Sequence, residues 1–289
     1  MKNLTFSCWA FLCIWPTLCV AQIYQEQPFK SADGTDLKAW LIHPEGLAAE
    51  QQRPVVLALH GCGGLYATQG VRREQLNARH DGMAQLLRAQ GYSVMFPDSF
   101  NARGEQSICT QKMRARKIKQ SHRRDDVTGA LTWLGTQKWV DVNKIAVLGW
   151  SHGGSAVLAA TNDNELGVSI RPVQPSMAIA FYPGCSDALR TGYQPKVPLL
   201  MLLGELDDWT PAAPCIELAK RVKAKAVVYP ESHHDFDNPV GSVKLREEVP
   251  NGVHPGRGVH AGRNPVTGPQ AWQMVVDALA ASWVVDVQH

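Results

Sequence analysis

The sequence has little net charge and none of the cysteine spacings that hold structural metal ions. Its 29 lysines and arginines nearly balance 26 aspartates and glutamates, for a formal net charge of +3. A chain this close to neutrality does not indicate nucleic acid or a membrane surface as a partner. No CxxC or Cys/His finger spacing is present, so we expect no structural zinc. Repeats and low-complexity tracts are also absent, and the 45% hydrophobic content allows a sizeable core, so the chain should be globular.

Long hydrophobic runs are missing too, except for one at the N-terminus. Lys2 precedes an uncharged apolar run over Leu4–Leu18, and the small residue Ala21 follows, as in a Sec signal peptide. A transmembrane anchor is disfavoured because the run is too short to span hydrocarbon and Pro16 interrupts it. We therefore expect cleavage after Ala21, a periplasmic or secreted protein without stable membrane association, and a single domain over residues 22–289.

Short apolar runs then alternate with segments of helical spacing. The runs predict strands buried on both faces; they cover Val55–Leu59, Tyr92–Phe96, Ile145–Leu148, Met177–Phe181, Leu199–Leu203 and Ala226–Tyr229. Helices are predicted over Leu76–Gln90, Asp125–Trp139, Ser155–Thr161, Ile216–Lys223 and Trp272–Trp283. Before them, extended stretches at Gln27–Lys30 and Leu37–Ile42 flank an Asp-Gly turn pair, which predicts a hairpin. The alternation favours an α/β fold, with a mostly parallel sheet between two layers of helices.

Four cysteines remain once the predicted signal peptide is removed, and an even number in an oxidising compartment suggests two disulfides. Cys62 ends one central strand and Cys109 lies in the loop after the neighbouring strand. Cys185 follows a third strand, and Cys215 opens the helix after the next one. Of the three possible connectivities we therefore expect Cys62–Cys109 and Cys185–Cys215.

Two stretches leave alternatives open. Residues Asn238–Gln270 are rich in glycine and proline without a sustained period. They form either an excursion beside the active site or a mere decoration. Residues Lys112–Arg124 are strongly basic, which indicates either a solvated face or a surface that attracts anionic substrates.

The strongest chemical motif is GWSHG at residues 149–153. It directly follows the predicted strand Ile145–Leu148 and precedes a helical pattern, which is the context of a nucleophile elbow. Ser151 is therefore the predicted nucleophile, and an ordinary helix N-cap serine is the less favoured alternative. The amide of His152, at the start of the helix, would point at a developing oxyanion.

A second glycine-rich turn, HGCGG at residues 60–64, ends the strand Val55–Leu59. Glycines here leave amides free to turn inward, so the N–H of Cys62, or less favourably that of Gly63, is the second predicted oxyanion donor. A plain glycine turn after a strand is the alternative.

Carboxylates and histidines follow the last two predicted strands. Asp207 and Asp208 lie at the carboxyl edge of the sheet, where ligands bind in open parallel sheets. Asp207 is favoured as the acid that accepts a hydrogen bond from the histidine. Either His233 or His234 must be the base, because a free serine hydroxyl is a poor nucleophile at neutral pH. These residues alone do not decide between the two histidines.

The adjacent histidines also invite a metal site. Neighbours on an extended chain point apart, however, and no third ligand has helical spacing. We therefore expect no metal ion and no cofactor.

Five segments resemble those of the dienelactone hydrolase family, which has the α/β-hydrolase fold. They are Leu59–Gly64, Phe96–Phe100, Leu148–Gly154, Gly204–Pro211 and Tyr229–Phe236. The resemblance covers nearly the whole chain after residue 21. It implies that the acid, three residues after the strand-end glycine, is Asp207, and that the base, in a histidine-x-phenylalanine step, is His234.

The nucleophile departs from the family pattern, since founding members use cysteine where this chain has Ser151. This difference predicts that the chain hydrolyses esters of a wider range than dienelactones, through an acyl-enzyme. The motif GWSHGG also resembles the elbow of prolyl oligopeptidase-like serine peptidases, but these usually carry a large extra domain. An inactive binding protein is disfavoured because competent residues fill all three triad positions.

Access to the site depends on the short connection Tyr182–Pro198, where lipases of this fold commonly insert a lid. Its prolines and glycines should break any helix. We therefore expect an open cleft without a lid, suited to small soluble esters.

Overall fold

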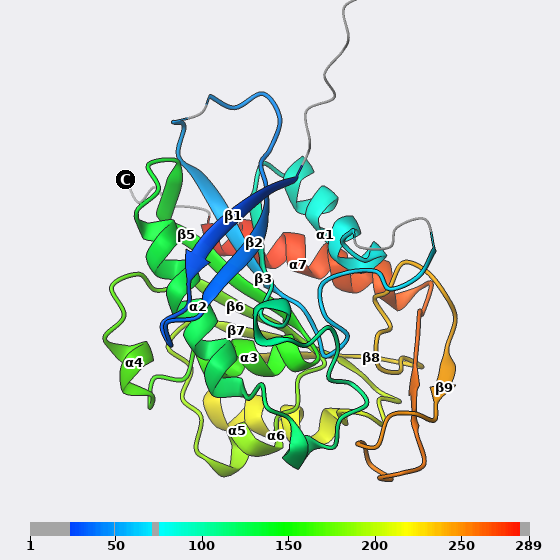
Figure 1. Ribbon diagram of the computed structural model, residues 1–289. Helices are drawn as coiled ribbons and strands as arrows, with labels where there is room; N and C mark the ends of the chain where they lie inside the picture. Colours follow the sequence, from blue (N-terminus) through cyan, green and yellow to red (C-terminus); the bar gives the residue numbers. More distant parts are fainter. Residues whose placement is uncertain (1–23, 49, 71–74, 284–289) are drawn as a thin grey trace, which may run out of the picture.

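An eight-stranded sheet forms the centre of the molecule (Figure 1). The computed structural model describes residues 24–48, 50–70 and 75–283, so the predicted signal peptide Met1–Ala21 lies outside the described residues. The strands are ordered β1-β2-β4-β3-β5-β6-β7-β8 across the sheet. In chain order they are β1 (Tyr24–Lys30), β2 (Asp36–Ile42), β3 (Arg53–Leu59), β4 (Ser93–Pro97), β5 (Val140–Trp150), β6 (Met177–Phe181), β7 (Leu199–Gly204) and β8 (Lys225–Tyr229).

Strands β3 to β8 pair in parallel, and β2 of the N-terminal hairpin is the strand of this sheet that runs against them. Strand β1 pairs antiparallel with β2, and β2 pairs antiparallel with β4. The interior strands β4, β6 and β7 are buried throughout, because helices cover both faces of the sheet. The six predicted strands and the predicted hairpin are therefore confirmed, with ends that shift by at most three residues except at β5, which begins five residues before the predicted Ile145.

Helices form a layer on each face of the sheet (Figure 1). They are α1 (Ala78–Ala89), α2 (Gln120–Gly135), α3 (His152–Ala160), α4 (Leu166–Ser169), α5 (Ser186–Arg190), α6 (Ala212–Val222) and α7 (Thr267–Trp283). On one face α2, α3 and α6 bury side chains with Leu57 of β3, and on the other α1 and α7 pack with Val56. Successive residues of a strand therefore pack against opposite helix layers, as the α/β-hydrolase fold requires. Among the described residues, no helix is long and apolar enough to cross a membrane.

Several helices differ from the sequence prediction: α3 and α6 begin three and four residues earlier than expected, α4 has no predicted counterpart, and α7, α2 and α5 differ as follows. Helix α7 begins at Thr267 rather than Trp272, because Pro269 falls in the first turn, where proline is tolerated. Helix α2 spans Gln120–Gly135 instead of Asp125–Trp139, because the chain must turn before β5 begins. The connection expected to contain no helix forms α5, which is only five residues long and buries none of its own residues.

The glycine- and proline-rich stretch Asn238–Gln270 contains a small sheet of its own. Strand β9 (Lys244–Arg246) pairs antiparallel with β10 (Val259–Ala261). The N–H of Gly262 donates to the His234 carbonyl at 2.8 Å. The stretch is therefore an excursion fastened to the loop after β8, beside the site described below.

Two disulfides join Cys62 to Cys109 and Cys185 to Cys215. These are the two pairs chosen from the sequence. Two such bonds fit an oxidising compartment.

Candidate active site

Ser151 lies at a sharp turn between β5 and α3. Its backbone has φ 54° and ψ −115°, a conformation that residues with a side chain rarely adopt. A Cβ on Gly149 would lie 2.3 Å from the Gly153 carbonyl oxygen, and one on Gly153 would lie 2.1 Å from the Leu59 carbonyl oxygen. Only glycine fits at either position, so strand, turn and helix meet as the GWSHG motif requires.

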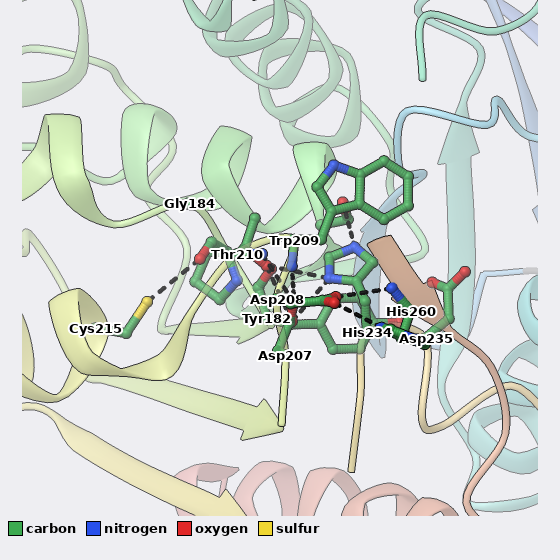
Figure 2. Close-up of polar contacts among 12 residues, drawn as sticks. Tyr182, Gly184, Asp207, Asp208, Trp209, Thr210, Cys215, His234, Asp235 and His260 are labelled. Atoms are coloured by element: carbon green, nitrogen blue, oxygen red, sulfur yellow. Dashed lines mark hydrogen bonds and ion pairs between the residues drawn. The ribbon is translucent and has the colours of Figure 1, made fainter. Parts of the chain in front are cut away.

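A chain of hydrogen bonds links Ser151, His234 and Asp207. His234 Nε2 lies 2.9 Å from Ser151 Oγ, and His234 Nδ1 lies 2.8 Å from Asp207 Oδ2. Figure 2 shows His234 close to Asp207. His234 is 1% exposed and Asp207 is 4% exposed, so both bonds are shielded from water. The structure thus brings together the three residues selected from the sequence.

The Asp207 carboxylate is held in place by its own loop. Its Oδ1 accepts hydrogen bonds from the N–H groups of Trp209 at 2.9 Å and Thr210 at 2.8 Å. The Thr210 hydroxyl donates to Oδ2 at 3.1 Å. These bonds orient Oδ2 toward His234. No role for Thr210 is predicted from the sequence, although an aspartate side chain often accepts from the backbone two or three residues further along, where Thr210 lies.

Asp208 and His233, the alternatives for acid and base, lie outside this chain of hydrogen bonds. Asp208 accepts from the backbone N–H of His260 at 2.8 Å and contacts His260 Nδ1 at 2.7 Å (Figure 2). The ring of His233 lies 5.3 Å from the ring of His260, measured between centroids. The geometry therefore supports Asp207 and His234.

The environment of His234 makes it a stronger base. Burial disfavours its charged form, but the charge of Asp207 and the hydrogen bond to it outweigh the burial, so the pKa of His234 is raised. The rings of Tyr182 and Trp209 lie 4.5 Å and 4.6 Å from the imidazole. They restrict the imidazole to the orientation that joins the serine to the acid.

Cys62 and His152, the predicted oxyanion residues, line the same cavity as Ser151. A Cβ on the neighbouring Gly61 would lie 3.5 Å from Ser151 Cβ, so the turn that carries Cys62 passes against the nucleophile. His152 is the first residue of α3. Its N–H is therefore one of those that a helix N-terminus leaves without an intrahelical partner.

Arg123 is buried beneath these two turns and connects them. Its Nη2 donates to the His60 carbonyl at 3.0 Å, and its Nη1 lies 3.1 Å from His152 Nδ1. Burial, together with the Arg123 charge, lowers the pKa of both His60 and His152 well below the ordinary value, so both rings stay neutral. The sequence shows Arg123 only as one of several basic residues, with no signal that it is buried.

A buried carboxylate that the sequence analysis missed supports the loop after β8. Asp237 accepts hydrogen bonds from the hydroxyl of Tyr182 at 2.6 Å and from the indole nitrogens of Trp150 and Trp272 at 2.9 Å and 3.1 Å. Arg79 donates to the same tyrosine hydroxyl at 2.9 Å. In the sequence Asp237 is one of several polar residues between His233 and Asn238, with no signal that it is buried.

An open cavity of about 640 Å³ leads to Ser151. Residues 250–253 of the excursion form part of its lining, and the basic run contributes Arg116 and Arg124. Arg124 is paired with Glu165 at 2.6 Å. Arg116 is 8% exposed, its Nε has no hydrogen-bond partner among the described residues, and burial lowers its pKa. The basic run therefore lines the cavity as well as facing solvent.

The family model of the dienelactone hydrolase family matches residues 37–281. The chain belongs to this family. Membership of the dienelactone hydrolase family makes the chain a carboxylic-ester hydrolase in class.

Solved structures agree with this family fold. A putative dienelactone hydrolase from Klebsiella pneumoniae subsp. pneumoniae MGH 78578 has a TM-score of 0.63 and 15% identity, over 90% of this chain and 99% of the other. Apo esterase 2 from Thermogutta terrifontis has a TM-score of 0.61 and 17% identity, over 90% of this chain and 94% of the esterase. Dipeptidyl peptidase 4 from Porphyromonas gingivalis has a TM-score of 0.53 and 20% identity, over 74% of this chain but only 32% of the peptidase.

Proposed function

We propose that this member of the dienelactone hydrolase family hydrolyses small soluble carboxylic esters, lactones included, through an acyl-enzyme formed on Ser151. The observation that carries the proposal is the pair of hydrogen bonds by which His234 joins Ser151 Oγ to Asp207. A serine, a histidine and a carboxylate in this arrangement are the groups that acyl transfer requires.

Acylation begins when His234 Nε2 takes the proton of Ser151 Oγ. The oxygen then attacks the ester carbonyl carbon. The carbonyl oxygen becomes negatively charged and accepts hydrogen bonds from the N–H groups of Cys62 and His152. Asp207 stabilises the imidazolium while it exists. His234 returns the proton to the departing alcohol, which leaves the acyl group on Ser151.

Deacylation repeats these steps with water. His234 removes a proton from a water molecule, the resulting oxygen attacks the acyl-enzyme, and Ser151 leaves with the proton that His234 returns. The buried Asp207–His234 pair serves both halves of the reaction without changing its own geometry.

The substrate class follows from the cavity. Helix α5 is too short to cover the cavity, whose volume is about 640 Å³. A cavity of this size accommodates a small ester, and no lipid surface is needed to open it. Arg116 faces this space with no carboxylate partner among the described residues. A substrate that carries a carboxylate would supply one, so we expect anionic esters to bind better than neutral esters of the same size.

Peptide hydrolysis is the weaker alternative. The likeness to the Porphyromonas gingivalis peptidase covers only 32% of that chain and shows the fold alone. The esterase from Thermogutta terrifontis is matched over 94% of its length, and that enzyme has been phosphorylated by paraoxon.

The proposal includes export. Residues 1–21 act as a signal peptide, and residues 22–289 form a single periplasmic or secreted domain. Support comes from the two disulfides, which fit an oxidising compartment. The intact mass of the exported protein should correspond to a chain that begins at Gln22; a membrane-bound protein that retains residue 1 would contradict this.

The nucleophile is tested with a fluorophosphonate probe followed by peptide mapping. The wild-type protein should carry the label on Ser151. Ser151→Ala should not be labelled, and its kcat toward p-nitrophenyl acetate should be lower by a factor of roughly 10⁴–10⁶. Ser169→Ala, which removes the hydroxyl of a serine in the distant helix α4, is the matched control and should behave as wild type. Labelling of another residue, or full activity in Ser151→Ala, would contradict the proposal.

A further inference from the structure

Three potential metal ligands meet next to the loops that carry Asp207 and His234. They are Asp208 in the loop after β7, His233 in the loop after β8, and His260 in β10. One ligand atom from each side chain lies within 4.8 Å of the other two. Figure 2 shows the His260 ring next to the Asp208 carboxylate.

Two features indicate that this cluster is arranged for a cation. The Nδ1 atom of His233 is buried and has no hydrogen-bond partner among the described residues, although the ring stands next to His260. No hydrogen bond at this nitrogen competes with the binding of an ion by the His233 ring. Within the described residues, the only ion-pair partner of Asp208 is His260, so no lysine or arginine neutralises this carboxylate.

The donor types also fit a metal ion, and the ligands need only a small movement to receive one. Asp208 Oδ2 and His260 Nδ1 are hydrogen-bonded at 2.7 Å. Two ligands that each lie ~2.0–2.2 Å from one tetrahedral ion are ~3.3–3.6 Å apart, so this pair has to open by less than ~1 Å. Two imidazoles and one carboxylate are ligands that zinc and its neighbours in the transition series accept, with water in the remaining position. The cluster is reachable, because the side chains of His260 and Asp208 are 47% and 32% exposed.

We propose that Asp208, His233 and His260 bind one divalent transition-metal ion of the zinc type. Each ligand adjoins a part of the site: Asp208 follows Asp207 and His233 precedes His234. Strand β10 carries the third ligand and is followed by Gly262, whose N–H donates to the His234 carbonyl. The ion therefore fastens the excursion to the loops that carry the acid and the base. The proposal does not depend on the proposed esterase activity.

Metal binding is measured on the untagged, exported protein after chelation and gel filtration. Zinc titration calorimetry should find one ion per chain, and cobalt should give visible absorption bands typical of nitrogen and oxygen ligands in a distorted tetrahedron. His260→Ala and Asp208→Asn should each weaken zinc binding by more than ~10-fold, the lower bound seen even for groups that only support a zinc ligand. His254→Ala, which removes an exposed histidine of the same excursion, should bind zinc as wild type does.

A second measurement separates this site from catalysis and from adventitious binding. Ser151→Ala should bind zinc with unchanged affinity, and saturating zinc should raise Tm in wild type but not in His260→Ala. Because His260 is exposed, its replacement leaves a folded protein in which the test stands even if Asp208→Asn does not fold. Absence of binding, or binding that survives both ligand substitutions, would overturn the proposal.

Discussion

The Cys62–Cys109 disulfide should matter for both stability and turnover, and a second bond in the same chain provides the control. The bond spans a sequence separation of 47 residues, and Cys185–Cys215 spans 30 residues. On the chain-entropy relation, removal of the first bond costs about 4 kcal/mol and removal of the second about 3.6 kcal/mol. The two losses of stability are therefore nearly equal, and each should lower Tm by roughly 10 °C.

The two bonds differ in what they hold. Cys62 carries the proposed oxyanion N–H, and its carbonyl accepts from the N–H of Ile108 at 2.8 Å, beside Cys109. Loss of this bond frees the turn to move away from Ser151. The double variant Cys62→Ala/Cys109→Ala should therefore lose kcat by roughly 10-fold or more, with ~10²–10³ as the limit for a donor that is lost completely.

Stability is measured by urea denaturation, and kcat by hydrolysis of p-nitrophenyl acetate at 25 °C, where both double variants are folded. Cys185→Ala/Cys215→Ala should lose comparable stability but little of kcat. Equal kcat in the two double variants would refute the role of the Cys62 turn. A loss of stability below about 1 kcal/mol would refute the chain-entropy argument.

Three further predictions concern single groups in the site. The value of kcat/KM should fall as the pH drops through the pKa of His234, which lies above the ordinary 6.5, because the protonated ring cannot accept the serine proton. A pH–rate profile should show this fall, and Asp207→Asn should move its inflection to lower pH. Arg116→Gln should raise KM for an ester that bears a carboxylate and change KM little for a neutral ester of the same length. Equal changes of KM for both esters would contradict an anion site. Asp237→Ala should destabilise the protein by about 3 kcal/mol in urea denaturation, since it leaves the buried donors of Tyr182 and Trp150 and the partly buried donor of Trp272 without this acceptor. A loss below about 1 kcal/mol would mean that water replaces the carboxylate.

Two of the wrong helix predictions arise where proline and glycine are taken as helix breakers. Pro269 lies inside the first turn of α7, and α5 forms between the glycines of a connection expected to have no helix. Both cases follow from the same cause. A proline or glycine excludes helix only at certain positions, and the position depends on where the helix starts, which neighbouring segments decide.

The side chains that the sequence analysis missed are buried polar groups. Arg123 and Asp237 look like ordinary charged residues in the printed sequence, yet both lie in the interior. Their burial is stable because each has hydrogen-bond partners from distant segments, such as His60 for Arg123 and Trp150 for Asp237. No local pattern carries that information.

The sequence by itself determined the strands, the parallel sheet, the elbow at Ser151 and the family, because apolar periodicity and glycine spacing record burial and close approach within a few residues. Only the tertiary structure brought His234 against Asp207 and Ser151, which are 27 and 83 positions away along the chain. It also placed the His233 ring beside His260, whereas the neighbouring His234 contacts Asp207 and Ser151. Adjacent residues on an extended segment point to opposite sides, so the direction that each side chain faces depends on how the loop is packed, and contacts remote in the sequence determine that packing.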